Sequence, residues 1–208
     1  MEGSSSNHFL AALLILLAFT SYTNPSSAAG VGAVAGKSST EFIKTSCSST
    51  TYPKLCYTSL STHASAIQTS PKLLAHTALS VTLDTAQSTS AMMLRLSQSH
   101  GMKPREVAAM RDCVEELSDS VEQLRKSIGE MNELKGSNFG FMVTDIQTWV
   151  SAALTDEDTC TDGFTSQAVN GTLKAVVRGR IMNIAHLTSN ALALINSYAS
   201  STRLVWEI

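Results

Sequence analysis

The sequence has little charge, few aromatic side chains and few residues that interrupt helices. Of its 208 residues, 15% are charged and 6% are aromatic, and there are 4 prolines and 11 glycines. So few turn formers argue against an all-β protein and against a disordered or collagen-like chain. A formal net charge of −2 excludes a strongly basic surface, so we expect no nucleic-acid partner. Apolar residues make up 43% of the chain, which is enough for the core of one domain.

One apolar run lies near the N-terminus and is too short to cross a membrane with its flanks. Residues 9–20 read FLAALLILLAFT, and small residues follow at 26–29. An apolar run of this length before small residues is typical of a secretory signal peptide. We therefore expect residues 1–29 to be removed and residues 30–39 to form a flexible mature N-terminus. The mature protein would then be secreted and would carry no membrane segment. A short membrane anchor is the alternative.

Four cysteines follow the signal segment, at Cys47, Cys56, Cys113 and Cys160. In an oxidising compartment, an even number argues for two disulfides. Three pairings are possible, and the spacing favours Cys47–Cys56 together with Cys113–Cys160. The alternative is a single bridge with two buried thiols. No Cys-x-x-Cys pair occurs, so neither a zinc ribbon nor thioredoxin chemistry is indicated.

Helical periodicity dominates the mature chain. A short helical hairpin is expected over 40–65, and four long helices are expected near residues 71–100, 104–136, 141–158 and 172–198. The second long helix has apolar residues at alternating steps of three and four, namely Val107, Met110, Val114, Leu117, Val121, Leu124, Ile128 and Met131. The pattern predicts an all-α domain over 40–208. In it, a disulfide-clipped hairpin precedes an antiparallel up-and-down four-helix bundle over 71–200.

The motifs of catalytic and metal-binding proteins are absent from the sequence. No histidine follows a glutamate by three residues on a helix, and HExxH, GxSxG, GxGxxG and phosphate-loop patterns are missing. We therefore expect no metal and no other cofactor, and the residues themselves give no support to an enzymatic activity. The sequon at Asn170, followed by Gly171 and Thr172, is a candidate site of N-glycosylation.

The second long helix carries one regularly spaced set of charged residues. Glu115, Asp119, Glu122 and Lys126 recur at helical spacing, on the side opposite the apolar seam. Spacing alone is more typical of a solvated helix face. The functional interpretation is an acidic docking surface for a basic partner.

Three segments around the cysteines resemble the plant invertase/pectin methylesterase inhibitor family. The first cysteine pair lies in FIKTSCSSTTYPKLCYTSL, the third cysteine in MRDCVEEL, and the fourth in IQTWVSAALTDEDTC, which TDGF follows. The last string is the most specific match, and the resemblance covers essentially the whole mature chain. It implies the clipped hairpin and the disulfide-stapled bundle. It also implies a non-enzymatic protein of the cell wall that binds a carbohydrate-active enzyme one to one and blocks it.

The resemblance also bears on which enzyme is blocked. Invertase inhibitors carry a Pro-Lys-Phe tripeptide, whereas here Pro-Lys precedes Leu55 and Leu73. This favours a stand-alone inhibitor that covers the substrate cleft of pectin methylesterase and so modulates pectin methyl-esterification, with acid invertase as the alternative target. The contact positions that the resemblance implies are Glu115, Asp119, Glu122, Gln147, Thr159 and Asp162.

A different class of function stays open on the sequence alone. A secreted bundle could bind a small apolar ligand in a cavity lined by methionines. The candidates are Met92, Met93, Met110, Met131 and Met142, although methionine at helical spacing is more often a core residue.

Overall fold

The computed structural model describes residues 28–165 and 171–206. Residues 1–27 of the expected signal segment and the sequon residue Asn170 lie outside the described residues. The chain divides into two units, Met1–Ala35 and Gly36–Ile208. In the first unit, the described residues 28–35 are helical, and everything that follows concerns the second unit.

Within the described ranges the backbone forms helices and turns and no strand, which confirms the all-α prediction. The elements are α2 (Ala28–Cys47), α3 (Pro53–Leu60), η2 (Ser61–His63), α4 (Ala64–Ile67), α5 (Pro71–Ser97), α6 (Pro104–Glu133), η3 (Gly136–Asn138), α7 (Phe139–Gly163) and α8 (Gly171–Trp206). None of the helices in this part of the chain is both long enough and apolar enough to cross a membrane.

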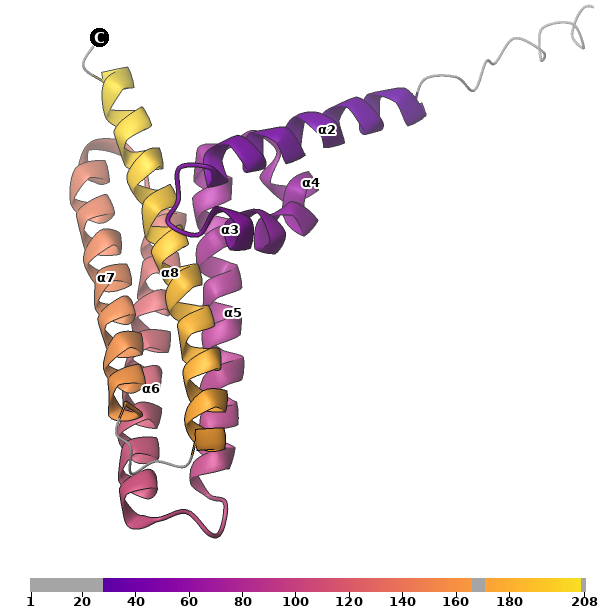
Figure 1. Ribbon diagram of the computed structural model, residues 1–208. Coiled ribbons are helices and arrows are strands. Elements are labelled where there is room, and N and C mark those ends of the chain that lie inside the picture. Colours follow the sequence, from indigo (N-terminus) through magenta and orange to yellow (C-terminus); the bar gives the residue numbers. More distant parts are fainter. Residues whose placement is uncertain (1–27, 166–170, 207–208) are drawn as a thin grey trace, which may run out of the picture. The chain divides into compact units, whose positions relative to one another are not determined.

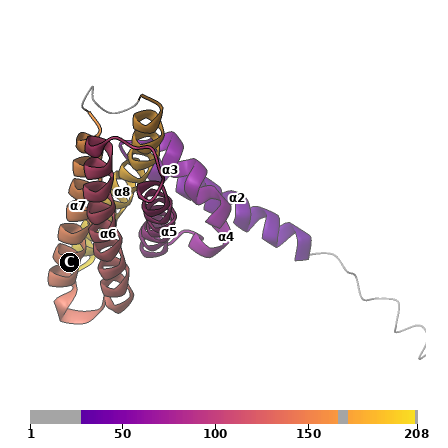
Figure 2. The ribbon, with the colours of Figure 1, turned by 90° about the horizontal axis from the view of Figure 1, so that it is seen from below.

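The helices α5, α6, α7 and α8 lie side by side and form a four-helix bundle (Figures 1 and 2). Each packs on two neighbours, because α5 contacts both α6 and α8, and α7 contacts the same two helices. Consecutive helices run in opposite directions (Figure 1), as short connections require. The up-and-down bundle predicted from the sequence is therefore confirmed.

Proline and local hydrogen bonds set where the long helices begin. Pro71 and Pro104 occupy the first turns of α5 and α6, where the missing N–H costs nothing. The Ser70 hydroxyl oxygen accepts a hydrogen bond from the Leu73 N–H at 3.3 Å, which caps α5. The Glu106 carboxylate accepts one from the Lys103 N–H at 2.8 Å at the start of α6.

The core stripe of α6 is rotated relative to the predicted apolar seam. Four of the predicted residues are fully buried, namely Met110, Leu117, Leu124 and Met131. Val107, however, is 44% exposed, and Val114 and Ile128 are only partly buried. Their places in the core are taken by Cys113, Ser120 and Ser127. The prediction considered only which side chains are apolar. In the structure, the Cys113–Cys160 disulfide and the buried hydrogen bond between Ser120 and Glu157 orient this side of α6 toward α7.

Three helices are longer than the sequence pattern predicted, and one of them is α8, which was expected to end at residue 198 and continues to Trp206. The third long helix was expected over 141–158, but α7 continues to Gly163, so Cys160 and Asp162 lie on the helix instead of after it. Residues 30–39, expected to be a flexible N-terminus, are helical within α2. Small residues suggested flexibility there, but alanine is the strongest helix former and no proline occurs between residues 26 and 52.

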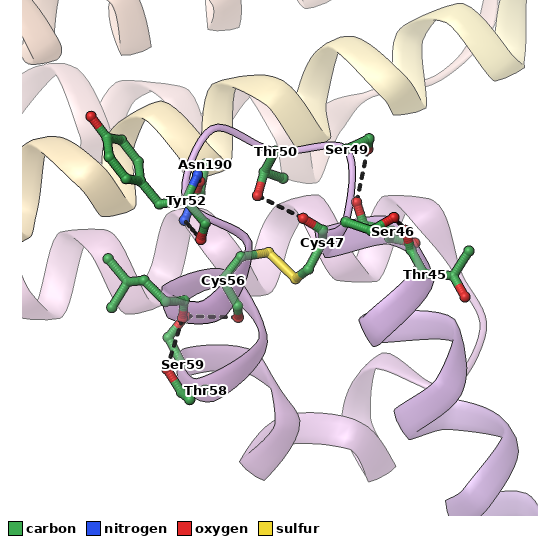
Figure 3. Close-up of a disulfide and its surroundings, with 12 residues drawn as sticks. Thr45, Ser46, Cys47, Ser49, Thr50, Tyr52, Cys56, Thr58, Ser59 and Asn190 are labelled. Atoms are coloured by element: carbon green, nitrogen blue, oxygen red, sulfur yellow. Dashed lines mark hydrogen bonds between the residues drawn. A yellow bond between two sulfur atoms is a disulfide. The ribbon is translucent and has the colours of Figure 1, made fainter.

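Both predicted disulfides are present, and no cysteine is free. Cys47–Cys56 joins the end of α2 to α3 (Figure 3). Asn190 of α8 holds the linker between them, because its side-chain amide and the backbone of Tyr52 exchange two hydrogen bonds of 2.9 and 3.0 Å (Figure 3). The hairpin is therefore tied to the bundle as well as clipped on itself.

We expect the two disulfides to contribute unequally to stability. Cys113–Cys160 closes a loop of about 48 residues and Cys47–Cys56 one of about 10, so replacing each pair with alanine should cost about 4 and about 3 kcal/mol of unfolding free energy, respectively. Urea denaturation of the two double variants, C113A/C160A and C47A/C56A, measures the difference. A larger loss for the shorter bridge would contradict the loop-closure argument.

Candidate protein-binding surface

The outer face of α6 carries the predicted acidic stripe. Glu115, Asp119, Glu122 and Lys126 are all exposed, opposite the buried stripe of the helix. Glu122 Oε1 and Lys126 Nζ lie 2.7 Å apart, and this hydrogen bond lowers the pKa of Glu122. Neither Glu115 nor Asp119 forms a hydrogen bond or an ion pair with any residue that the structure describes. The stripe therefore offers two unpaired carboxylates beside one neutralised pair.

The three predicted residues of α7 lie in two different places. Thr159 and Asp162 are exposed on its last turns, and the Thr159 hydroxyl donates to the backbone oxygen of Thr155 at 2.8 Å. Gln147 is partly buried where α7 meets α8, and its amide donates to Asn196 Oδ1 at 2.7 Å. It lies about 18 Å along the helix from Thr159, from the rise of 1.5 Å per residue. Gln147 is thus separated from the other predicted α7 residues.

The C-terminal half of α7 lies against the acidic part of α6. Cys113–Cys160 joins the two helices, and one turn away Asp156 of α7 interacts with Glu116 and Asp119 of α6. Burial raises the pKa of Asp156 to about 6, and repulsion by these two carboxylates adds to the effect. Asp156 Oδ2 is buried without a hydrogen-bond partner. The structure therefore groups Asp119 with two carboxylates that the sequence analysis did not single out.

The sequence pattern contained these additional acidic residues but did not show that they belong to the site. Asp156 belongs to the TDEDTC string, and Glu116 directly follows Glu115. Spacing on a single helix shows which residues share a stripe, but it does not show which side of that helix meets a neighbour. Only the packing of α6 on α7 reveals that Glu116 and Asp156 flank the same seam.

The charge of this face suits protein recognition. Over its whole length α7 carries five acidic residues and no lysine or arginine. No three His, Cys, Asp or Glu side chains in residues 28–165 and 171–206 are grouped so that they could hold a metal ion. A concentration of carboxylates on a rigid helix pair attracts and orients a partner with basic or polar groups.

The hollows on the described surface give no support to a bundle that binds an apolar ligand. One groove of about 470 Å³ is open to solvent and is lined by Tyr52, Lys54, Leu55 and His186, among others. Another of about 500 Å³ is lined by Val176, Gly179, Arg180 and Asn183 and is also open. Of the methionines proposed to line a cavity, Met93, Met110 and Met131 are fully buried in the core, and Met92 and Met142 are partly buried and pack against it.

A disulfide-stapled helical bundle with an acidic helix face has a surface suited to binding another protein. The family described as plant invertase/pectin methylesterase inhibitor matches residues 41–194. The chain therefore belongs to this family, as the cysteine segments suggested.

Individual proteins agree with this assignment. The chain is 45% identical to pectinesterase inhibitor 11 of Arabidopsis thaliana, over 90% of this chain and 95% of that protein. It is 42% identical to a 21 kDa protein of Daucus carota, over 96% and 98% of the two chains. The crystal structure of a mutant form of a pectin methylesterase inhibitor from Arabidopsis superposes with a TM-score of 0.61, at 25% identity, covering 74% of this chain and 95% of that one.

We expect Asp156→Asn to stabilise the fold in a pH-dependent way. Because the pKa of Asp156 is raised to about 6 in the folded state, its ionisation removes stability as the pH rises from about 4 to 6. The variant should therefore gain stability over the parent at pH 7.5 and not at pH 3.5. The gain should stay below about 1 kcal/mol, since much of the group is exposed to screening solvent.

Urea denaturation at the two pH values measures this gain. Asp145→Asn, at an exposed position of the same helix, is the matched control and should show no such difference. An Asp156→Asn effect that is equal at both pH values would contradict the electrostatic explanation.

Proposed function

We propose that this protein is an inhibitor of pectin methylesterase. The observation that carries the proposal is its 45% identity to pectinesterase inhibitor 11 over nearly the full length of both chains. The structural match to a crystallised pectin methylesterase inhibitor also supports the proposal, because it compares the folds of the two proteins. None of the reported relatives is named as an invertase inhibitor, and neither Pro-Lys pair precedes phenylalanine.

Inhibition would follow from occlusion of the enzyme's substrate cleft by a rigid surface, in a one-to-one complex. The helices that present the candidate residues are covalently joined by Cys113–Cys160 and packed on a common core. A surface that is ordered before binding loses little conformational entropy when the complex forms. Exposed Glu115, Asp119 and Asp162 would meet basic or polar groups at the rim of the cleft and steer the encounter.

The remaining candidates would contribute in different ways. Glu122 would reach the enzyme as part of its pair with Lys126, so it adds little net charge. Thr159 is exposed next to the disulfide and would make a short-range contact. Gln147 would contact the enzyme from the seam between α7 and α8, where Asn196 fixes its amide.

The setting of this activity would be the plant cell wall, after secretion and removal of the N-terminal segment. Blocking the esterase leaves more methyl esters on pectin and fewer free carboxylates. Carboxylate oxygens are the preferred ligands of Ca²⁺, so inhibition would reduce the cross-linking of pectin by calcium.

The proposal is tested by titrating the purified, oxidised protein into assays of a plant pectin methylesterase and of an acid invertase. We expect saturable inhibition of the esterase at one inhibitor per enzyme and no effect on the invertase. Inhibition of the invertase alone would show that the target is wrong. Circular dichroism and thiol titration confirm that the added protein is helical and fully disulfide-bonded.

We expect charge reversal on α6 to weaken inhibition. Asp119→Lys replaces an exposed, unpaired carboxylate at the centre of the face, so the inhibition constant should rise about tenfold or more, equivalent to about 1.4 kcal/mol. The loss should shrink at high salt, because screening weakens long-range attraction.

Asp84→Lys provides the matched control for this charge reversal. It changes an equally exposed acid on α5, which packs on α6 and α8 and carries none of the candidate residues. Equal effects of the two substitutions would mean that net charge matters and the α6 face does not.

A further inference from the structure

A carboxyl group lies in the centre of the bundle, and the proposed inhibition makes no use of it. Glu157 of α7 is fully buried, one turn before the disulfide residue Cys160. Its Oε1 lies 2.8 Å from the hydroxyl of Ser120 on α6 and 3.0 Å from the hydroxyl of Thr188 on α8. Ser120 and Thr188 are also fully buried. A single side chain thus connects three of the four bundle helices.

The number of protons available to these groups favours a neutral carboxyl. The Thr188 hydroxyl lies within hydrogen-bond distance of both Glu157 Oε1 and the backbone oxygen of Ile184, at 3.1 Å, but it has only one proton to donate. If Glu157 carries its proton on Oε1, it donates to Thr188, and Thr188 donates to Ile184. Ser120 then donates to Oε1, and every hydroxyl in the chain is used.

An ionised Glu157 would fit the same site poorly. The Thr188 hydroxyl would then have to donate its hydrogen bond to the carboxylate, and the Ile184 backbone oxygen would lose the hydrogen bond from Thr188. Glu157 Oε2 has no hydrogen-bond partner among the described residues, so half of the negative charge would be buried without a donor. Burying a charge without a partner is far more costly than burying a neutral carbonyl oxygen.

Among the residues that the structure describes, no cation compensates such a charge. The charged groups that act on Glu157 are Asp156 and Asp158, both acidic and both on α7. On α6, the nearby carboxylates are Glu116 and Asp119, which act on Asp156. The titratable group of α8 that is closest in sequence is His186, two residues before Thr188, and its ring stacks on Tyr52 at 3.7 Å. The buried positions of α5 are apolar residues and threonines.

We propose that Glu157, together with Ser120 and Thr188, forms a proton-dependent clasp that holds α6, α7 and α8 in register while Glu157 is neutral and loosens when it ionises. Glu157 is then a positioning residue for the face that α6 and α7 present. The clasp is a property of the free protein, and only its bearing on inhibition rests on the proposed function.

The direction of the pH effect follows from the burial of the group. Desolvation raises the pKa of Glu157 from 4.5 to about 8, against the opposing effect of the two hydroxyl hydrogen bonds. A carboxyl with a raised folded pKa binds more protons in the folded state than in the unfolded state. The contribution of Glu157 to stability is therefore greatest in acid and falls as the pH rises from about 4.5 to 8. The pKa of Asp156 is about 6, so its titration is largely complete above about pH 7, and Glu157 dominates the remaining decline.

The experiment measures thermal unfolding of the oxidised protein between pH 6 and 9, without any esterase present. For the parent protein, we expect the melting temperature to fall by about 5 °C or more across this range. Glu157→Gln keeps the shape of the neutral side chain and cannot ionise, so it should fall by less than half as much. Asp145→Asn, which removes an exposed carboxyl at the other end of α7, should keep the parent slope.

Equal slopes for the parent and Glu157→Gln would overturn the proposal. If the variant does not fold, carbon NMR of the parent protein labelled at the glutamate carboxyl carbons decides the question. An inflection of the Glu157 signal above pH 6.5 supports the clasp, and an inflection below that value overturns it. Since no enzyme is used, a failed clasp and a failed esterase assay are separate results.

Discussion

The contact between α6 and α7 is the constraint on which the rest of the structure depends. Cys113–Cys160 fixes both the rotation and the register of the two helices, because each cysteine has to face the other. With Cys113 turned inward, Ser120 lies two turns further along the same side of α6 and meets Glu157 of α7. The opposite side of α6, with Glu115, Asp119 and Glu122, must then face solvent. One covalent bond thus determines what is buried and what is presented to a partner.

Periodicity predicted the parts of this arrangement that are local along the chain. The four long helices, the clipped hairpin and the exposed stripe of α6 all follow from residue spacing within single segments. The rotation of α6 did not, because a seam of valine and isoleucine looks like the best core face until a disulfide and a buried hydroxyl take precedence. Asp156 escaped notice for a related reason. Its environment is made by Glu116 and Asp119, about forty residues earlier in the sequence.

Neighbouring carboxyls on α7 show how strongly helix rotation determines chemistry. Asp156 and Glu157 are adjacent in sequence, and a rotation of about 100° separates their side chains. Asp156 lies at the seam with α6, partly in contact with solvent and beside two other acids. Glu157 lies in the core and is held by hydroxyls of two other helices. Burial raises both pKa values, but repulsion by carboxylates of α6 contributes only at Asp156.

This division separates the groups that tune stability from the groups that face a partner. Glu157 is buried between three helices, so in the proposed clasp its proton bears on how firmly they are held, whereas Glu115, Asp119 and Asp162 are exposed and available to a partner. Protonation in mild acid also lessens the repulsion within α7, which has five acids and no base to balance them. In mild acid, the bundle can therefore carry an acidic docking face without losing the stability of the helices that present it. The hydrogen-bond chain from Ser120 to Ile184 is the part of the structure that makes these two requirements compatible.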